Sequence, residues 1–492
     1  MFQRSSGVLL HVSSLPGPYG IGDLGPEAWR FVDWLAEARC SYWQILPLGP
    51  TGFADSPYAS HSSYAGNVDL ISPQLLIEER LIDPPALLDP ADHVDFPLVS
   101  ESKWRLVEQS HSRLAGELRS EFDDFIERER GWLEAYALFM ALKDAHHGAS
   151  WVDWDPALRR RDPVALSTAA VELGEDVRLH QFGQFIFYRH LEQLRRHAAA
   201  RQVRIIGDVP LYVATDSVDV WLRPELFAID VETGKPELVA GVPPDRFSPE
   251  GQHWGVPTYR WEAHRSEGFE WWIGRIEAFL RQADVLRIDH FTGFARYYAI
   301  DGTSTDPRDG EWHDGPGAAL FDALADRVGD IDLILEDLGP LGDIVERLRK
   351  RLGYPGMRIL QEAFDENAEE GLDPENFPVD CVVYTGTHDN DTARGRFEAE
   401  GDGYRERALN FTGRTVNTFS WDLIAGTWNS TPVVAIAPMQ DILDLGSEAR
   451  MNRPGTIEGN WQWRMPGVLI DPRLTSKLAE LNRHTGRDPM AR

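Results

Sequence analysis

Residues 285–290 read Val-Leu-Arg-Ile-Asp-His, and residues 333–337 read Leu-Ile-Leu-Glu-Asp. Each stretch is a short apolar run that ends in charged residues, which is typical of a buried parallel strand whose carboxyl end reaches a polar edge. Helical patterns at 183–200, 317–328 and 341–352 lie before, between and after the two runs. Strands and helices in alternation favour an α/β fold with a parallel sheet.

The same pattern recurs along the whole chain. Short apolar runs bounded by Gly, Pro, Asp or His occur in the order 7–10, 42–46, 203–207, 285–289, 331–336, 357–360, 381–385 and 433–437. Helical patterns separate most of them; the segment 26–38 has Pro in its first turn and places Trp29 and Val32 on one apolar face. Eight strands that alternate with helices predict a (β/α)8 TIM barrel of the α/β class.

The spacing of the predicted strands locates insertions into a single barrel that spans 1–492. A helical subdomain is predicted at about 68–165, between the second and third strands, with amphipathic helices over 102–130 and 132–146. A second subdomain, rich in Trp, Pro and Gly, is predicted at about 211–282, between the third and fourth strands. No β-sandwich domain is expected after the eighth strand.

Charge and cysteine content exclude several classes of protein. The formal net charge of −30 argues against binding to nucleic acid or to an anionic membrane, because both need clustered Lys and Arg. No stretch approaches the roughly 18 apolar residues of a membrane span, and no signal-peptide core is present, so a cytoplasmic location is expected. Cys40 and Cys381 are expected to be small buried hydrophobic residues rather than a disulfide or a metal site.

Charged residues gather at the ends of the predicted strands. In a TIM barrel the carboxyl ends of the strands meet at one rim, where catalytic groups lie. The polar side chains expected there are Asp208, Arg287, Asp289, His290, Glu336, Asp337, His388, Asp389 and Asn390. Charged groups that close an apolar strand are costly to desolvate unless they have partners, so their concentration on one rim indicates a catalytic site.

Two kinds of chemistry could use such a rim. A metal hydrolase needs histidines and carboxylates as ligands, and these could be Asp208, Asp289, His290, His388 and Asp389. A retaining glycosidase instead needs a nucleophile and an acid/base whose carboxyl groups are about 5–5.5 Å apart, and adjacent strand ends offer roughly that separation. The residue types favour the glycosidase and leave the metal hydrolase open.

Arg287 and Glu336 strengthen the glycosidase interpretation. Arg287 precedes Asp289 by two residues, so the two side chains share one side of the strand, and the guanidinium is expected to keep the carboxylate ionised and oriented. Glu336 follows an apolar run, and burial near other carboxylates is expected to raise its pKa toward the working range of an acid.

Longer strings of residues narrow the choice. Residues 287–291 (RIDHF), 336–339 (EDLG) and 387–390 (THDN) are similar to the conserved regions of the α-amylase superfamily. Further strings lie at 15–25, 55–58, 241–245, 251–255 and 450–455. Together they cover nearly the whole chain and resemble the amylomaltase (4-alpha-glucanotransferase, or disproportionating enzyme) family, glycoside hydrolase family 77. The resemblance implies a TIM-barrel enzyme that needs neither a cofactor nor a metal.

The resemblance also implies a role for each matching residue. Asp289 matches the nucleophile that forms a covalent glycosyl-enzyme, Glu336 the general acid/base, and Asp389 the third carboxylate, which binds sugar hydroxyls and favours a distorted ring. The residues expected to bind sugar are Tyr58, Asp208, Arg287, His290 and His388 around the nucleophile, Gln252 and Trp254 on a mobile loop over the acceptor side, and Asn460 and Trp461 at an outer contact.

By the same resemblance, the expected substrates are α-1,4-glucans, from maltooligosaccharides to starch or glycogen chains, with transfer to the 4-hydroxyl of glucose or another glucan. The alternatives are an α-1,4-glucan hydrolase with weak transfer activity, a non-catalytic glucan-binding barrel, and the metal hydrolase. Thr292 stands where many members have Arg, and Phe53-Ala54 where Tyr-Gly is usual, so a secondary glucan site near Phe53 is in question. The sequence leaves the oligomeric state open.

Overall fold

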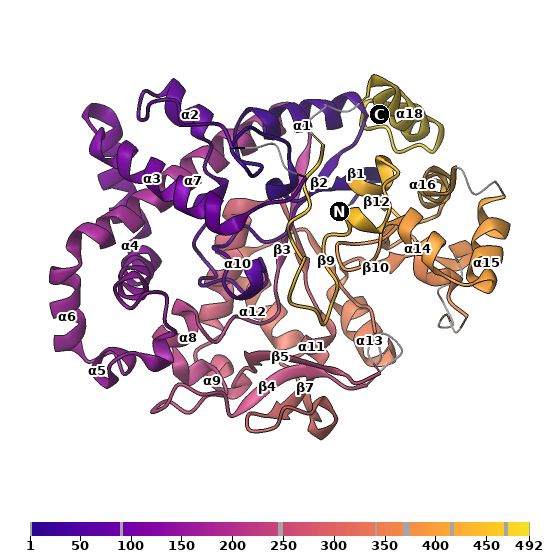
Figure 1. The fold of residues 1–492 in the computed structure, drawn as a ribbon. Helices are drawn as coiled ribbons and strands as arrows, with labels where there is room; N and C mark the ends of the chain where they lie inside the picture. Colours follow the sequence, from indigo (N-terminus) through magenta and orange to yellow (C-terminus); the bar gives the residue numbers. More distant parts are fainter. Residues whose placement is uncertain are drawn as a thin grey trace.

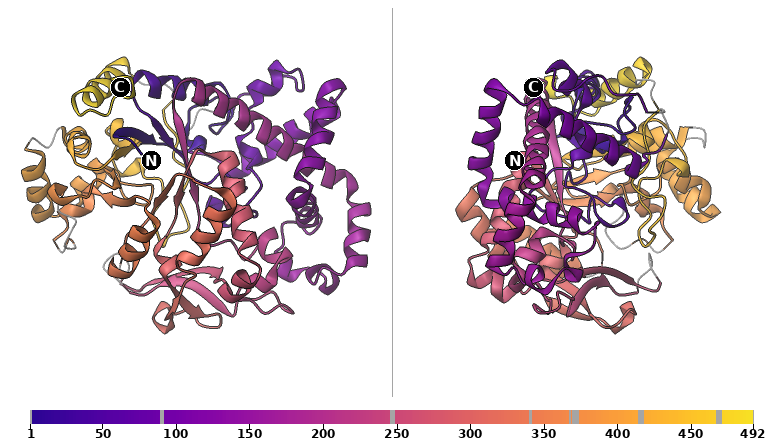
Figure 2. Two further views of the ribbon diagram at one scale, coloured as in Figure 1. Left: turned by 180° about the vertical axis from the view of Figure 1, so that it is seen from behind. Right: turned by 60° about the vertical axis from the view of Figure 1, so that its left-hand side comes forward.

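A computed structural model describes residues 2–88, 92–244, 249–339, 342–366, 368, 374–413, 418–466 and 471–491. Asp245, the last residue of the string at 241–245, and Leu341, the predicted start of one helix, lie outside the described residues. The chain forms a central sheet surrounded by helices, with a helical lobe that carries α3, α4 and α6 on one side (Figures 1 and 2).

The central sheet is a barrel of eight parallel strands, in the order β10-β11-β12-β1-β2-β3-β6-β9. A hydrogen bond from Leu335 N to Pro355 O (2.9 Å) joins the two ends of this order. The strands are β1 (Ser5–Leu9), β2 (Tyr42–Gln44), β3 (Arg204–Val209), β6 (Val285–Ile288), β9 (Leu333–Leu335), β10 (Gly356–Ile359), β11 (Cys381–Tyr384) and β12 (Val434–Pro438). All eight predicted strands are present, and the predicted TIM barrel is confirmed.

The strands that carry the two proposed catalytic carboxylates, β6 and β9, each end one residue earlier than predicted. β6 ends at Ile288 and β9 at Leu335, so Asp289 and Glu336 are the first residues beyond their strands. Their backbones are still hydrogen-bonded to the neighbouring strand, because Asp289 N donates to Val209 O of β3 (3.0 Å) and Glu336 N donates to Ile288 O of β6 (3.1 Å). The two carboxyl groups therefore leave the packed interior but start from fixed backbone positions.

Helices cover the barrel because each turns an apolar stripe toward it. α1 (Pro26–Glu37) starts at a proline, as predicted, and buries Phe31, Val32 and Leu35. The helices predicted at 183–200, 317–328 and 341–352 correspond to α7 (Gly174–Ala200), α12 (Ala318–Val328) and α13 (Gly342–Leu352). The longer ones among the others are α10 (Glu270–Gln282), α15 (Asp402–Thr412), α16 (Phe419–Asn429) and α18 (Pro472–His484). The shorter ones are α8 (Val218–Leu222), α9 (Trp261–Ser266), α11 (Thr292–Ala295), α14 (Ala393–Ala399) and α17 (Met439–Ile442).

The chain between β2 and β3 is helical, but its helices divide differently from the prediction. The structure has α3 (Phe96–Ser112) and one long helix, α4 (Gly116–Ala145), instead of helices at 102–130 and 132–146. The break falls before Gly116, whose φ is +58°, and α4 runs through Gly131. A glycine inside a helix costs only about 1 kcal/mol relative to alanine, which is too little to end a helix that packs along its length. The same segment contains α2 (Pro73–Glu78), α5 (Pro156–Arg159) and α6 (Pro163–Glu172).

A second, antiparallel sheet lies at the bottom of the view in Figure 1. Its order is β5-β4-β7-β8, and its strands are β4 (Leu238–Val242), β5 (Gln252–Pro257), β7 (Arg296–Asp301) and β8 (Glu311–Asp314). β4 and β5 precede β6 in the sequence, whereas β7 and β8 follow it. This sheet therefore combines segments that come before and after one barrel strand. No residue pattern in the sequence analysis predicted it, because its pairing joins segments that are far apart in sequence.

The two cysteines have the buried, unpaired state expected from the sequence. Cys40 and Cys381 are free and buried, as predicted. Burial raises the pKa of the Cys40 thiol to about 11, so it remains a neutral packing group. Within the part of the chain that the structure describes, no helix combines the length and the apolar character needed to cross a membrane.

Candidate active site

Arg287 and Asp208 form the floor of the rim. β3 and β6 pair in a register that places Asp208 directly opposite Arg287. Nη1 of Arg287 donates to both carboxylate oxygens of Asp208 at 2.7 Å. The two side chains are 1% and 0% exposed. Breaking a buried ion pair by removing one partner leaves an uncompensated charge, so this pair holds two strand ends together.

The same guanidinium contacts two further carboxylates. Nη1 lies 3.1 Å from Oδ1 of Asp289, and Nη2 lies 2.9 Å from Oε2 of Glu336. Arg287 and Asp289 share one side of the chain, as their spacing predicts. Burial by itself would lower the pKa of Arg287, but the surrounding carboxylates raise it well above its ordinary value. A single permanent cation therefore fixes three acids.

Arg287 supplies positive charge among the acids of the rim. Within the described residues, no three His, Cys, Asp or Glu side chains are grouped so that they could hold a metal ion. The residues considered as ligands of a metal hydrolase instead lie near Arg287, and each of them interacts electrostatically with its charge. They are Asp208, Asp289, His290, His388 and Asp389. The geometry favours the two-carboxylate chemistry.

One carboxylate oxygen of Glu336 makes both of its contacts with the protein. Its Oε2 accepts a hydrogen bond from the backbone N–H of His290 (2.6 Å) and forms an ion pair with Nη2 of Arg287 (2.9 Å). Among the described residues nothing donates to Oε1, so this oxygen is free to carry a proton. Burial raises the pKa of Glu336 above its ordinary 4.5; Asp289 and Asp389 add to the increase, and Arg287 and the N–H of His290 oppose it. The predicted direction is confirmed, and it suits a proton donor.

The pKa of Asp289 is also raised, opposite to the direction expected from the neighbouring Arg287. Burial raises it, and the nearby charges of Asp208 and Asp389 add to the increase. Arg287 and His388 favour the ionised form, as expected for Arg287, but they are outweighed. The main cause is burial in the folded chain, to which the acids packed nearby add, and a single strand sequence shows neither. The side chain is 23% exposed, so the carboxylate can meet a ligand at the rim.

Asp389 lies in the turn after β11, and its pKa is shifted in the opposite direction to those of Asp289 and Glu336. The turn is held by Asn390, whose Oδ1 accepts from the N–H (2.8 Å) and the hydroxyl (2.9 Å) of Thr387. Oδ2 of Asp389 lies 3.2 Å from Nε2 of His388. Burial by itself would raise the pKa of Asp389, but His388 and further hydrogen bonds lower it well below its ordinary value. Asp389 in turn raises the pKa of His388 against the effect of burial, so the two form an ion pair.

Asn452 is a site residue that the sequence analysis did not single out. Its Nδ2 donates to Oδ1 of Asp389 at 2.6 Å, and its backbone N–H donates to the carbonyl of His388 at 3.1 Å. Arg450 donates to the Asp389 carbonyl at 2.7 Å. These contacts orient the third carboxylate from a segment about sixty residues away in the chain. The available signal was the string at 450–455, in which a polar amide precedes a Pro-Gly turn.

Tyr58 and Trp461 add an aromatic wall beside His388. The Tyr58 hydroxyl donates to Oδ2 of Asp208 (2.7 Å) and lies 2.9 Å from Nε2 of His388, and the two rings stack at 5.3 Å. The Trp461 ring lies 5.6 Å from that of Tyr58. Asn460 is different: its side chain accepts from Arg453 N (2.9 Å) and donates to Thr456 O (2.9 Å), so it shapes its own loop. The structure thus brings the Trp461 ring to the rings of Tyr58 and His388, whereas the Asn460 amide bonds within its own loop.

Gln252 and Trp254 approach the site from the other side. They lie on β5, an edge strand, rather than on the loop that the resemblance implied. Trp254 Nε1 donates to Oε1 of Gln252 at 3.0 Å. The Trp254 ring meets the ring of His290 edge-to-face at 5.0 Å and 85°. The N–H of His290 in turn donates to Glu336, so Trp254 contacts the residue that binds this acid.

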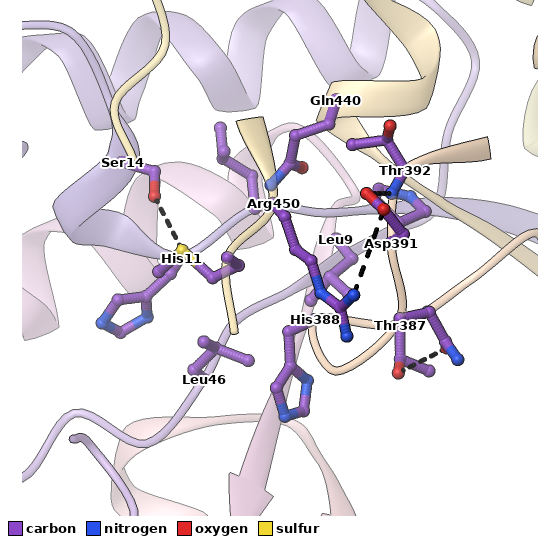
Figure 3. A pocket seen from close by; sticks show the side chains of 14 residues that line it. Leu9, His11, Ser14, Leu46, Thr387, His388, Asp391, Thr392, Gln440 and Arg450 are labelled. Carbon is purple, nitrogen blue, oxygen red and sulfur yellow. Dashed lines mark hydrogen bonds and ion pairs between the residues drawn. The ribbon is translucent and has the colours of Figure 1, made fainter. Parts of the chain in front are cut away.

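A small cavity beside His388 is lined by residues that include His11, Ser14 and Arg450 (Figure 3), together with Met451. Its volume is about 20 Å³. That is room for a single water molecule and not for a sugar ring. A sugar must therefore reach the acids from the rim, where the Asp389 side chain is 38% exposed.

Comparison with known proteins identifies relatives along nearly the whole chain. The family model described as 4-alpha-glucanotransferase matches residues 10–470. A 4-alpha-glucanotransferase of Synechocystis sp. is 43% identical over 497 residues, which cover 99% of this chain and 98% of the relative. A 4-alpha-glucanotransferase of Thermus thermophilus is 44% identical over 499 residues, which cover 98% of this chain and 99% of the relative.

A solved structure shows the same arrangement of the chain. The amylomaltase of Streptococcus agalactiae, determined in complex with acarbose, matches with a TM-score of 0.95 at 37% sequence identity. The match covers 99% of this chain and 100% of the amylomaltase. Likeness of this extent includes the barrel and both inserted segments.

Proposed function

Because the chain belongs to the 4-alpha-glucanotransferase family of transglycosylating enzymes, we propose that Asp289 and Glu336 transfer α-1,4-glucan segments by a retaining double displacement. The observation that carries this assignment is that both carboxyl groups contact one guanidinium, at 3.1 and 2.9 Å. Groups held so close together fit the separation of about 5–5.5 Å in retaining enzymes better than the wider spacing of inverting ones.

In the first step Glu336 gives a proton from Oε1 to the glycosidic oxygen, while Asp289 attacks the anomeric carbon. The bond from that carbon to the leaving sugar breaks as the bond to Asp289 forms. The leaving sugar departs with the proton, and the donor segment remains as a glycosyl ester of Asp289. The raised pKa of Glu336 keeps it protonated for this step at a higher pH than an ordinary glutamate.

In the second step Glu336, now a carboxylate, takes the proton of the 4-hydroxyl of an acceptor glucan or of glucose. The acceptor oxygen attacks the anomeric carbon, and the ester bond to Asp289 breaks. Two inversions restore the α configuration. Asp389 and His388, which form an ion pair beside Tyr58, are proposed to bind hydroxyls of the donor sugar and to favour its distorted ring.

Transfer instead of hydrolysis requires that the acceptor subsite favour a sugar over water. We assign this role to Gln252 and Trp254, because Trp254 stands against His290 next to Glu336. A flat indole offers an apolar surface to the C–H face of a sugar and excludes water from the ester. The proposed substrates are α-1,4-glucans such as maltooligosaccharides, with glucose as an acceptor; the acarbose complex of the solved relative supports binding of such sugars.

The covalent step is tested with Glu336→Gln and an α-maltosyl fluoride donor, whose fluoride leaves without a proton. Asp289 is expected to attack, and the ester should accumulate because no base remains for the second step. Intact-protein mass spectrometry should show one added glycosyl unit, and peptide mapping should place it on Asp289. The double variant Asp289→Asn, Glu336→Gln serves as the unlabelled control. A label on Asp389, or none, would refute the assignment.

Transfer itself is tested with purified protein and maltotriose without added cofactor. Glucose should appear together with a ladder of longer maltooligosaccharides, while the number of reducing ends stays constant. Trp254→Ala should raise the fraction of turnovers that end in hydrolysis, seen as an increase in reducing ends. An unchanged fraction in Trp254→Ala would remove the proposed acceptor role of this residue and leave the assignment of Asp289 and Glu336 untouched.

A further inference from the structure

β5 carries Gln252 and Trp254, yet strand pairing supports it on one side only. In the described part of the chain β5 pairs with β4 and with no other strand. Its other side faces residues 211–216, the segment that follows β3. The Thr215 hydroxyl donates to Gly255 O at 3.2 Å, and the Tyr212 ring lies 5.9 Å from that of Trp254. We call residues 211–216 the bracket.

The inner end of the bracket is fixed by α10. Arg275 donates to Leu211 O (3.2 Å) and to Tyr212 O (3.4 Å), and the Tyr259 hydroxyl also donates to Leu211 O (2.7 Å). Arg275 is 2% exposed, and its guanidinium lies 4.8 Å from the centre of the Trp272 ring. Tyr212 further stacks on Tyr259 at 5.8 Å. The backbone of Tyr212 therefore has little freedom to move.

The outer end of the bracket is fixed by the helical segment inserted between β2 and β3. Trp151 Nε1 donates to Thr215 O (2.7 Å), and Trp151 N donates to Oδ1 of Asp216 (3.2 Å). Lys143, on α4, donates to Oδ2 of Asp216 at 2.6 Å, and its side chain is 6% exposed. The inserted helices thus hold the backbone of Thr215, whose hydroxyl holds β5.

We propose that the bracket positions β5 for transfer, and that the helical insertion, acting through Lys143, Trp151 and Asp216, thereby sets how often an acceptor sugar rather than water takes the glycosyl group. Tyr212 and Thr215 are positioning residues in this scheme, since neither lies among the acids. The inference rests on the proposed acceptor role of Trp254. It gives the insertion between β2 and β3 a task in specificity.

The physical basis is that acceptor selection depends on small displacements. A shift of about 1 Å in a group that positions substrate can change a rate by about 100-fold. Trp254 lies on an edge strand, so its position depends on what supports the unpaired side. Loosening the bracket leaves the contacts of Asp289, Glu336 and Arg287 intact, and formation of the glycosyl ester should be little affected.

The test compares Thr215→Val, which removes the hydroxyl at constant shape, with Thr215→Ser, which keeps it. Asp216→Asn weakens the contact to Lys143 at the other end of the bracket. Asp123→Asn is the matched control, because Asp123 forms an ion pair with Arg178 (2.7 Å) on the same insertion, away from the bracket. The readout is the hydrolysed fraction of turnovers on maltotriose, which does not depend on how much of a variant is folded.

Thr215→Val and Asp216→Asn should each raise the hydrolysed fraction about two- to fivefold, the effect expected from one hydrogen bond. Thr215→Ser and Asp123→Asn should keep the wild-type fraction. In Thr215→Val and Asp216→Asn, KM for an acceptor such as glucose should rise, while the rate of ester formation from maltosyl fluoride stays constant. In a Trp254→Ala background Thr215→Val should add nothing further.

Wild-type fractions in Thr215→Val and Asp216→Asn, alongside a raised fraction in Trp254→Ala, would overturn the inference and leave the proposed function standing. An additive effect of Thr215→Val on top of Trp254→Ala would also overturn it, because the bracket would then not act through Trp254. A wild-type fraction in Trp254→Ala would remove the acceptor role itself and the inference with it. The label on Asp289 tests the catalytic assignment independently of all three results.

Discussion

The backbone N–H of His290 donates to Oε2 of Glu336 over 2.6 Å, and His290 holds it there with a left-handed φ of +45°. A non-glycine residue in that region is strained, and such strain persists where the surrounding structure enforces it. Here the strain turns the residue after the nucleophile so that its N–H meets the acid/base. Its ring faces Trp254, so His290 connects both proposed subsites.

Replacing His290 by Gly and by Ala separates this strain from the loss of the ring. Both variants lose the contact with Trp254, and both keep the N–H that donates to Glu336. Glycine adopts a positive φ without cost, so His290→Gly should be more stable than His290→Ala by about 0.5–1 kcal/mol, or roughly 1–3 °C in Tm. Thermal unfolding of the two variants under the same conditions measures this difference in stability. If His290→Ala were as stable as His290→Gly, the backbone of His290 would not be strained.

The alkaline limb of the pH profile of kcat/KM should belong to Glu336, which must be protonated for the first step. Because burial and the neighbouring acids raise its pKa, the limb should lie above the ordinary 4.5 of a glutamate. The limb should disappear with α-maltosyl fluoride, since fluoride leaves without a proton. Persistence of the same limb with the fluoride donor would assign it to another group.

In Asp389→Asn the alkaline limb should shift to lower pH, because the charge of Asp389 contributes to the raised pKa of Glu336. The shift is measured on the residual activity with maltotriose, buffered across the range at constant ionic strength. A limb that stays in place would mean that the two carboxylates are not electrostatically coupled.

Asp289→Asn and Glu336→Gln should abolish turnover and yet stabilise the fold at neutral pH. A carboxyl group whose pKa is higher in the folded than in the unfolded chain destabilises the fold when it ionises. The free energy of unfolding falls as pH rises from the unfolded pKa to the folded pKa, and above the folded pKa the loss is complete. Both groups have raised pKa values, so a neutral amide should raise Tm by roughly 1–3 °C at pH 7. At a pH below the ordinary value of 3.8 for Asp289 the gain of Asp289→Asn should vanish. A lower Tm at pH 7 would show that the acids stabilise the fold when ionised.

Asn452→Ala should lower kcat/KM about 10- to 100-fold, the usual effect of losing a hydrogen bond to a charged group. Its side chain is the donor that holds Oδ1 of Asp389 at 2.6 Å. Asn429→Ala is a suitable control, because Asn429 is exposed and its side chain bonds to a carbonyl of its own helix. Wild-type kcat/KM in Asn452→Ala would show that Asp389 keeps its orientation without this contact.

Activity should persist after dialysis against a chelator, and added Mg²⁺, Mn²⁺ or Zn²⁺ should not increase it. The reason is that Arg287, with three carboxylates within 3.1 Å, supplies the permanent positive charge at the centre of the acids. Loss of maltotriose conversion in chelator, restored by a metal, would revive the metal-hydrolase alternative.

Some of this protein was predictable from neighbouring residues alone. Apolar runs such as 285–288 carry the period and length of buried strands, and eight of them between helices leave a TIM barrel as the consistent arrangement. The positions of Asp289 and Glu336 at the ends of such runs place both carboxylates on one rim. Even the shared side of Arg287 and Asp289 follows from the two-residue period of an extended chain.

Other features arose only when distant segments met. Asn452 reaches Asp389 across about sixty residues, β7 and β8 complete a sheet begun before β6, and Lys143 supports Thr215 through Asp216. The raised pKa of Asp289 belongs to this group, because it depends on the burial of this carboxyl group and on the acids packed beside it. Local periodicity is set by backbone geometry within a few residues, whereas burial, ion-pair sharing and the support of an edge strand depend on packing. Packing is a property of the closed barrel and its insertions, and no single stretch of sequence contains it.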